Sequence, residues 1–296
     1  MAKAKDYIAV IFAMIFWSFS FIWTRIAMQS FNPVTLISLR LVIAAALLFA
    51  FVTFTGKFQK IAKKDLKWFL LLAFFEPFLY YMGETYGLTM VEPTLASVIV
   101  ATIPLFASLF AVVFLRERIG IINISGIVVS LLGVFLVVND KTGGKVVGTG
   151  ILLLFLAVFS AVIYSIILKK IPKHYTSLNI VMYQSMLALL FFIPTFFVTD
   201  FATISTIHIT LRATGALLML SVFASMLAFV FFSSVIRKLG VAKTTVFNNL
   251  IPVFTAFFSW LILDEILSTP KFSGVCIVIL GLFISQLKLK SAKGHE

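Results

Sequence analysis

Hydrophobic residues run through this chain in long stretches that short polar segments interrupt. The first stretch, residues 7–28, contains no charged residue before Arg25. A helix of about 20 apolar residues spans the hydrocarbon core of a bilayer, and stretches of this length recur to the end of the chain. The pattern predicts an all-α integral membrane protein with ten transmembrane helices. We expect them near residues 7–28, 33–54, 67–89, 94–115, 119–138, 148–170, 178–198, 211–236, 242–263 and 271–289.

Positive charge is unevenly distributed between alternate connections of this predicted topology. If the N-terminus is cytoplasmic, the cytoplasmic side receives the five lysines of residues 57–67 and the three of residues 169–173. Few basic residues remain for the other side. They are Arg25, Lys141, Lys145, Arg212 and Lys271. Because cytoplasmic loops carry the excess of Lys and Arg, the sequence predicts a multi-pass protein of the cytoplasmic membrane with both termini in the cytoplasm.

Composition excludes several other classes of protein. The chain is 61% hydrophobic and 12% charged, which is untypical of a soluble domain. Its net charge of +13 lies in short loops, so we expect no nucleic-acid partner. Cys276 is the only cysteine, and the three histidines have no metal-ligand spacing, so we expect neither a disulfide, a metal nor a cofactor. The expected partners are the lipid bilayer and a small-molecule cargo, for a monomer or a homodimer.

The two halves of the chain repeat one another. The segment IPLFASLFAVVFLRERI from Ile103 returns as IPVFTAFFSWLILDEIL from Ile251. The same alignment, without a gap, matches Glu117 with Glu265, Gly126 with Gly274, and Gly133 with Gly281. Five helices in each repeat place the second repeat upside down in the membrane. The sequence therefore predicts two inverted five-helix repeats, residues 1–138 and 148–296, joined by a loop at 139–147; the second ends in a short cytoplasmic tail.

These paired segments resemble the EamA-type transporters of the drug/metabolite transporter superfamily. The resemblance rests on the proline followed thirteen residues later by glutamate, and on SG with a second glycine seven residues on, in both halves. It implies a cytoplasmic N-terminus, a central cavity between the repeats, and transport of amino acids, sugars or related metabolites. It does not imply which cargo.

Glu76 is the clearest candidate for function within the hydrocarbon. It lies nine residues beyond Lys67, hence roughly 13 Å along a helix and near the midplane. Tyr80 follows one turn later on the same face, and Pro77 predicts a helix break, as do Pro104 and Pro252. A lone carboxylate at this depth indicates proton coupling or the binding of a cationic group on the cargo. The alternative is a protonated Glu76 that holds two helices together.

Glu84 has a different expected role. It lies roughly 7 Å from the outer end of its helix, at a depth that the same rise per residue also gives to Arg25 and Arg40. Opposite charges at equal depth in hydrocarbon favour pairing. We expect Glu84 to form an ion pair with one of these arginines, with a structural or gating role; the alternative is that Glu84 is a ligand of the cargo.

Further cavity candidates come from three helices. In the first, Trp17 and Thr24 share a face with Ser20 beside them, and a tryptophan facing a cavity can stack on flat cargo. By the repeat, Tyr164 of the sixth helix approaches the same cavity. In the ninth, Asn248 is expected to face it while Asn249 bonds between helices. Ordinary packing is the alternative for the aromatic residues.

Glu117 and Glu265 end their helices at opposite membrane surfaces. Their matched positions predict symmetric gating roles, whereas the alternative is a charged helix end without function. The function expected from the whole sequence is a secondary transporter that exports small metabolites by alternating access. The alternatives are an intramembrane enzyme acting on lipid-linked substrates and a non-transporting scaffold, but no arrangement of side chains for catalysis is visible in the sequence.

Overall fold

The chain is helical throughout the part that the structure describes. This structure is a computed structural model that describes residues 4–107, 110, 121–140, 148–206, 208–239, 244 and 246–285. Five helices in these ranges are long and apolar enough to cross a membrane, and shorter apolar helices accompany them. The long ones are Ala4–Ala27, Pro33–Phe54, Gly148–Leu168, Ser177–Thr199 and Leu211–Leu239.

The described elements fall within or near the predicted spans, while parts of the spans 94–115, 119–138, 242–263 and 271–289 lie outside the described residues. The first half contains α1 (Ala4–Ala27), α2 (Pro33–Phe54), α3 (Leu66–Ala73), the π-helix η1 (Phe74–Leu79), α4 (Tyr80–Met90), α5 (Pro93–Val100) and α7 (Ile121–Val138). The second half contains α8 (Gly148–Leu168), α9 (Ser177–Thr199), η2 (Phe201–Thr206), α10 (Leu211–Met219), the π-helix η3 (Leu220–Ala228), α11 (Phe229–Leu239), η4 (Val246–Leu250), α13 (Ile251–Leu263) and α14 (Thr269–Ser285).

Several predicted spans are interrupted rather than continuous. Between α3 and α4 the backbone at Glu76 leaves the helical region, with φ −145° and ψ 116°. The next residue, Pro77, has no N–H for a helical hydrogen bond. Pro252 lies in the first turn of α13, after the 3₁₀ segment η4. Pro104 likewise follows the turn at residues 101–102 that ends α5. The three prolines expected to break helices therefore lie at or next to breaks.

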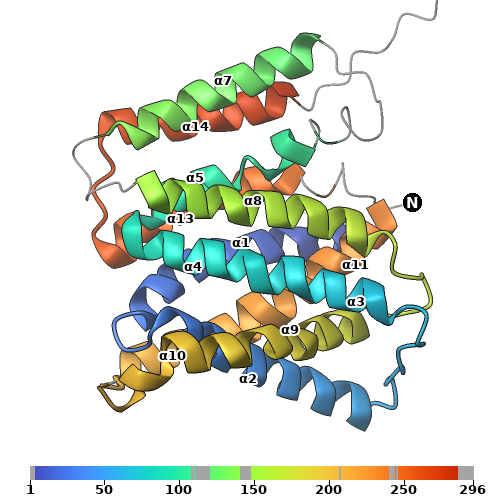
Figure 1. The fold of residues 1–296 in the computed structure, drawn as a ribbon. Coiled ribbons are helices and arrows are strands. Elements are labelled where there is room, and N and C mark those ends of the chain that lie inside the picture. Colours follow the sequence, from blue (N-terminus) through green and yellow to red (C-terminus); the bar gives the residue numbers. More distant parts are fainter. Residues whose placement is uncertain are drawn as a thin grey trace, which may run out of the picture.

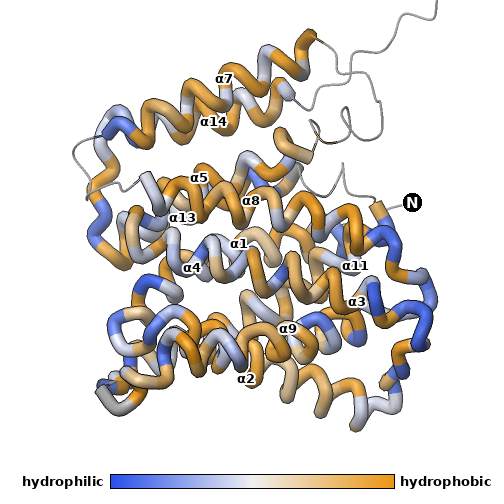
Figure 2. Tube along the Cα trace, viewed as in Figure 1, coloured by the Kyte–Doolittle hydropathy of each residue, from blue (hydrophilic) through white to orange (hydrophobic). Residues whose placement is uncertain are grey.

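The helices lie side by side with their axes near one common direction, and their connections gather at two ends (Figure 1). Figure 2 shows long apolar segments between these ends and hydrophilic segments concentrated at the connections. Many large apolar side chains are exposed, among them Phe54 at 89%, Leu190 at 58% and Phe283 at 50%. An apolar surface of this extent matches the hydrocarbon of a bilayer as its solvent.

Glycines join α7 to α14 at one edge of the bundle (Figure 1). A Cβ atom added to Gly133 would lie 2.7 Å from the carbonyl oxygen of Gly274. One added to Gly281 would lie 2.7 Å from the carbonyl oxygen of Gly126 and closer still to the backbone nitrogen of Ser130. Because Gly126 meets Gly281 and Gly133 meets Gly274, the two helices run antiparallel. Small residues let helix backbones approach this closely in membranes.

The variant Gly281→Ala tests this contact. The added methyl group has no space, so the helices must separate, and overpacking of this kind typically lowers the free energy of unfolding by about 1–3 kcal/mol. Gly215→Ala is the matched control, because nothing lies within 4 Å of its added Cβ. Thermal unfolding in detergent should show a lower midpoint for Gly281→Ala alone. Equal midpoints would contradict the tight contact.

Candidate functional site

A cavity lies at the centre of the bundle, between the two halves of the chain. It is lined by residues of the first half, such as Arg40 and Glu76, and of the second half, such as Tyr164 and Asn248. Most of the residues selected from the sequence line it. These are Glu76, Tyr80, Trp17, Ser20, Tyr164 and Asn248 from the proposed substrate and coupling set, and Glu84 and Arg40 from the proposed ion pairs. Thr24 and Arg25 are not among its lining residues.

The two carboxylates come from one interrupted helix. Glu76 stands at the break in η1 and is 7% exposed, and Glu84 lies two turns further on in α4 and is 3% exposed. The hydroxyl of Tyr80 donates to Oε1 of Glu84 at 3.1 Å. Glu76 has no hydrogen bond or ion pair to any described residue. The break therefore presents one carboxylate to the cavity without a protein partner.

Arg40 brings a buried positive charge to the same cavity from α2. Its side chain is 1% exposed, and its Nε donates to Oγ of Ser225 at 2.8 Å. The guanidinium carbon lies 4.0 Å from the centre of the Tyr81 ring, within the range of cation–π attraction. Its Nη1 has no hydrogen-bond partner among the described residues. Two side chains therefore hold the guanidinium while one of its nitrogens remains unpaired.

The expected ion pair of Glu84 is not formed in this structure. Among the described residues, no salt bridge joins Glu84 to Arg25 or Arg40. Arg25 instead donates from Nη1 to the carbonyl oxygen of Leu88 at 2.7 Å. That carbonyl lies in the last turn of α4, where helical carbonyls lack partners within the helix. Arg25 therefore contacts α4, but it bonds to a backbone carbonyl of that helix and not to the carboxylate of Glu84.

Aromatic side chains form much of the remaining wall. The centre of the Trp17 ring lies 5.2 Å from that of Phe229 and 4.7 Å from that of Phe232, and both pairs are packed edge to face. The hydroxyl of Tyr164 donates to Gln184 at 3.4 Å, and that of Ser20 donates to the carbonyl oxygen of Trp17 at 2.6 Å. Because both hydroxyl protons already form hydrogen bonds within the protein, this part of the wall presents mainly aromatic ring surfaces to the cavity.

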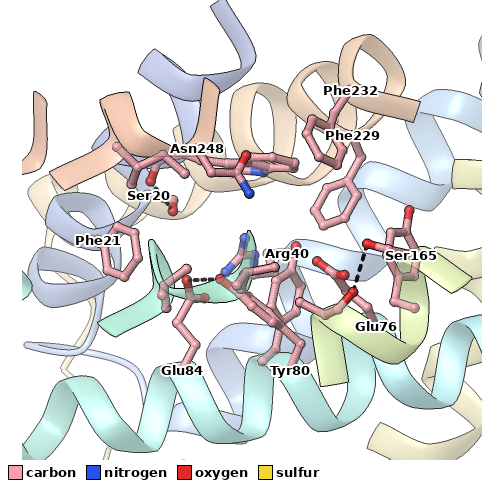
Figure 3. Close-up of a pocket in the computed structure, with 17 residues that line it drawn as sticks. Ser20, Phe21, Arg40, Glu76, Tyr80, Glu84, Ser165, Phe229, Phe232 and Asn248 are labelled. Atoms are coloured by element: carbon pink, nitrogen blue, oxygen red, sulfur yellow. Dashed lines mark hydrogen bonds between the residues drawn. The ribbon is translucent and has the colours of Figure 1, made fainter. Parts of the chain in front are cut away.

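Asn248 faces this wall from the 3₁₀ segment η4. It is 5% exposed, and its Oδ1 has no partner among the described residues. Figure 3 shows Asn248 and Ser20 on one side of the cavity, across from Arg40, Tyr80 and Glu84. Asn249 does not line the cavity, and neither atom of its side-chain amide has a partner among the described residues. The structure therefore shows no bond between helices for Asn249.

An ion cluster lies away from the cavity, at one end of the bundle. The Nζ of Lys271 is 2.6 Å from Oε2 of Glu92 and 3.1 Å from Oε1 of Glu265. The backbone N–H of Thr94 also donates to Glu265, at 3.4 Å. Burial raises the pKa of Glu265 above its ordinary value, and Lys271 acts against that shift. The cluster joins the start of α5 to the α13–α14 connection, so it links the two halves.

Glu265 thus has a charged partner, Lys271, and shares it with Glu92, an arrangement that the sequence did not indicate. The spacing of Glu265 and Lys271 was visible, but no pattern connected either residue to Glu92. The sequence reasoning also missed four residues of the cavity wall and its support, because each looks like an ordinary packed residue in its own helix. These are Tyr81, Ser225, Phe229 and Phe232. Glu117, the predicted counterpart of Glu265, lies outside the described residues, as do Arg116 and Arg118.

Comparison with known proteins places this architecture in a family. The profile of the EamA-like transporter family matches residues 4–139 and, a second time, residues 148–287. The chain belongs to the EamA-like transporter family. Two matches in tandem agree with the repeat found in the sequence.

Relatives of this EamA-like transporter include proteins from an archaeon and a bacterium. An uncharacterized transporter of Archaeoglobus fulgidus is 26% identical over 280 residues, which cover 95% of this chain and 98% of the relative. The uncharacterized transporter YetK of Bacillus subtilis is 27% identical over 270 residues, covering 89% and 81%. A protein of known crystal structure aligns with a TM-score of 0.72 at 15% identity, covering 97% and 99%, and shares the fold. The chain is therefore a multi-pass membrane transporter.

The variant Lys271→Met tests the ion cluster of this EamA-like transporter. It leaves Glu92 and the buried Glu265 without their cation, and the loss of one partner from a buried ion pair costs about 3–5 kcal/mol of unfolding free energy. Lys170→Met is the control, because Lys170 is exposed and none of the salt bridges among the described residues involves it. Denaturant unfolding in micelles measures both variants. Similar losses of unfolding free energy in the two variants would contradict a stabilising role for the ion cluster.

Proposed function

We propose that this protein is a secondary transporter that exports small metabolites, amino acids or related compounds, across the cytoplasmic membrane by alternating access. The observation that carries the proposal is the central cavity. It holds Arg40, Glu76 and Glu84, and ionisable groups at membrane depth face binding sites or ion pathways. The cavity draws its walls from both halves of the chain, which is where transporters built from repeats bind their cargo.

The packing of the helices supports two inverted repeats. When the halves are exchanged, α2 corresponds to α9, α5 to α13, and α7 to α14, and each helix packs on its counterpart. Likewise α1 packs on the interrupted helix around η3, while α8 packs on the one around η1. Exchanging the two halves of the chain therefore maps each of these helix–helix contacts onto a contact of the same set. The antiparallel course of α7 and α14 agrees with an inversion of one half.

Bonds between the halves at both ends of the bundle support a gated cavity. At one end the carboxylate of Asp200 accepts hydrogen bonds from the backbone nitrogen and Oγ1 of Thr35, at 2.7 and 2.8 Å. The cluster of Lys271 lies at the same end. At the other end the N–H of Gln59 donates to Asn179 at 3.0 Å, and the hydroxyl of Tyr175 donates to Asp65 at 3.0 Å. Alternating access requires one set to break while the other holds.

Proton coupling is assigned to Glu76. It faces the cavity without a hydrogen bond or ion pair to any described residue, whereas Glu84 already accepts a hydrogen bond from Tyr80. A carboxylate that has no fixed partner can take up and release a proton as the cavity opens to either side. This arrangement favours Glu76 over Glu84 as the coupling residue.

Reconstitution into liposomes tests transport and coupling together. We expect wild type to carry members of a radiolabelled panel of amino acids and metabolites, and to carry them faster under a pH gradient. Glu76→Gln should lose the response to the gradient, because an amide does not exchange a proton in this way. Asp264→Asn is the matched control, since Asp264 is exposed in a connection and asparagine also tolerates its positive φ of 55°.

The outcomes of this experiment are separable. An absence of flux for every compound would contradict the transporter and leave the scaffold hypothesis. A wild-type pH response in Glu76→Gln would contradict the coupling role alone.

Labelling of single cysteines tests the proposed orientation. In a Cys276→Ser background, Lys60→Cys and Ile266→Cys place exposed thiols at opposite ends of the bundle. Since the end rich in lysine should face the cytoplasm, a membrane-impermeant maleimide should label Ile266→Cys in intact cells. It should label Lys60→Cys only after permeabilisation. The reverse pattern would contradict cytoplasmic termini.

A further inference from the structure

The guanidinium of Arg40 has a fixed orientation within the central cavity. Ser225 accepts from its Nε at 2.8 Å, and the Tyr81 ring lies 4.0 Å from its central carbon. The hydroxyls of Tyr81 and Ser225 are themselves 3.3 Å apart. These contacts come from α2, α4 and η3, and thus from both halves of the chain. An arginine held on two sides is preorganised for a planar partner rather than free to turn away.

The unmet hydrogen-bonding groups of the cavity have a definite pattern. Nη1 of Arg40 is a buried donor without a partner among the described residues, and Oδ1 of Asn248 is a buried acceptor in the same condition. Glu84 has one oxygen engaged by Tyr80, and the described residues provide no donor to its Oε2. A buried polar group without a partner is costly. The pattern calls for a ligand with an anionic acceptor on one side and N–H donors on another.

The planar fork of N–H donors on a guanidinium matches the oxygens of a carboxylate or a phosphate, and a carboxylate carries the single charge that one arginine balances. Arg40 is the only cation among the described residues that line the cavity, whereas Glu76 and Glu84 are acids. An ammonium group on the same ligand would provide N–H donors for Glu84 and Asn248. Each of the two fixed charges, Arg40 and Glu84, would then meet one opposite charge of the ligand.

The other walls indicate what the ligand carries besides its two charges. Trp17, Phe229 and Phe232 present ring surfaces to the cavity. Such surfaces favour an apolar substituent and offer no partner to a second charged group.

We infer that the cavity binds an apolar α-amino acid by its carboxylate, which accepts hydrogen bonds from Arg40, while the ammonium group faces Glu84 and Asn248. This inference rests on the proposed function in taking the cavity as the cargo site. It adds that the carboxylate is required, and that Arg40, rather than the acids alone, selects the cargo. Ser225 is a positioning residue that acts through Arg40.

Binding to the purified full-length protein in detergent tests the inference without relying on transport. The probes are L-leucine, L-leucinamide, 3-methylbutylamine and 4-methylpentanoate, which share a branched apolar chain and differ in charged groups. L-leucine should raise the melting temperature and show the tightest binding by calorimetry. Removal of the free carboxylate, in the amide and in the amine, should weaken binding about tenfold to a hundredfold, as expected for a lost charged hydrogen bond.

Variants localise the effect. Arg40→Gln should bind L-leucine no better than wild type binds L-leucinamide, and should no longer distinguish the two. Arg40→Lys keeps the charge without the fork and should fall between them. Arg25→Gln is the matched control, because Arg25 bonds to the Leu88 carbonyl outside the cavity. The probe series on wild type remains decisive even where a variant does not fold.

Two results would overturn the inference. One is binding of L-leucinamide or 3-methylbutylamine to wild type as tightly as L-leucine, which would place recognition on the acids. The other is no binding of L-leucine at its highest soluble concentration. Neither result touches the proposed function, because liposome flux of any other compound would still establish transport. Conversely, bound L-leucine without flux of any compound would leave the site standing and contradict export.

Discussion

The cost of charge and unpaired backbone in hydrocarbon governs where polar residues stand in this protein. A bilayer offers no water to solvate a charge, so charged side chains at this depth pair within the protein or line a cavity. Arg40 lies against Tyr81 and Ser225, and Lys271 is enclosed by Glu92 and Glu265. Elsewhere the segments between the two ends are largely apolar (Figure 2). The few polar residues at depth are therefore concentrated where both halves of the chain meet.

The same constraint explains the positions of the helix breaks. Irregular backbone at membrane depth is tolerated where it is buried in protein or lines a cavity. Glu76 stands at the break in η1, and Asn248 lies in the 3₁₀ segment before α13; both line the cavity. Each break re-aims a polar side chain that a regular helix would direct elsewhere. The breaks thus build the site as much as the side chains do.

The α7–α14 pair has a separate role from the cavity. No residue of either helix lines the cavity among those described, and Figure 1 shows the pair at the edge of the bundle. Its glycines bring two backbones into contact, which joins the end of one half to the end of the other. Such a pair can hold the halves together while the remaining helices move around the cavity.

Hydrophobic periodicity and charge determined a great deal by themselves. The length of each apolar stretch predicted the spans, the matched Pro, Glu and Gly residues predicted the repeat, and the distance from Lys67 predicted a depth for Glu76. Depth and face follow from the rise and turn of one helix, so they are readable locally. The rotation of one helix relative to the next cannot be read from the local sequence, because it depends on packing between distant segments. Only the tertiary structure therefore paired Arg40 with Ser225, 185 residues away, and Lys271 with Glu92, 179 residues away. For the same reason, the sequence could not show that Arg40 contacts Tyr81 and Ser225, with no salt bridge to Glu84 among the described residues.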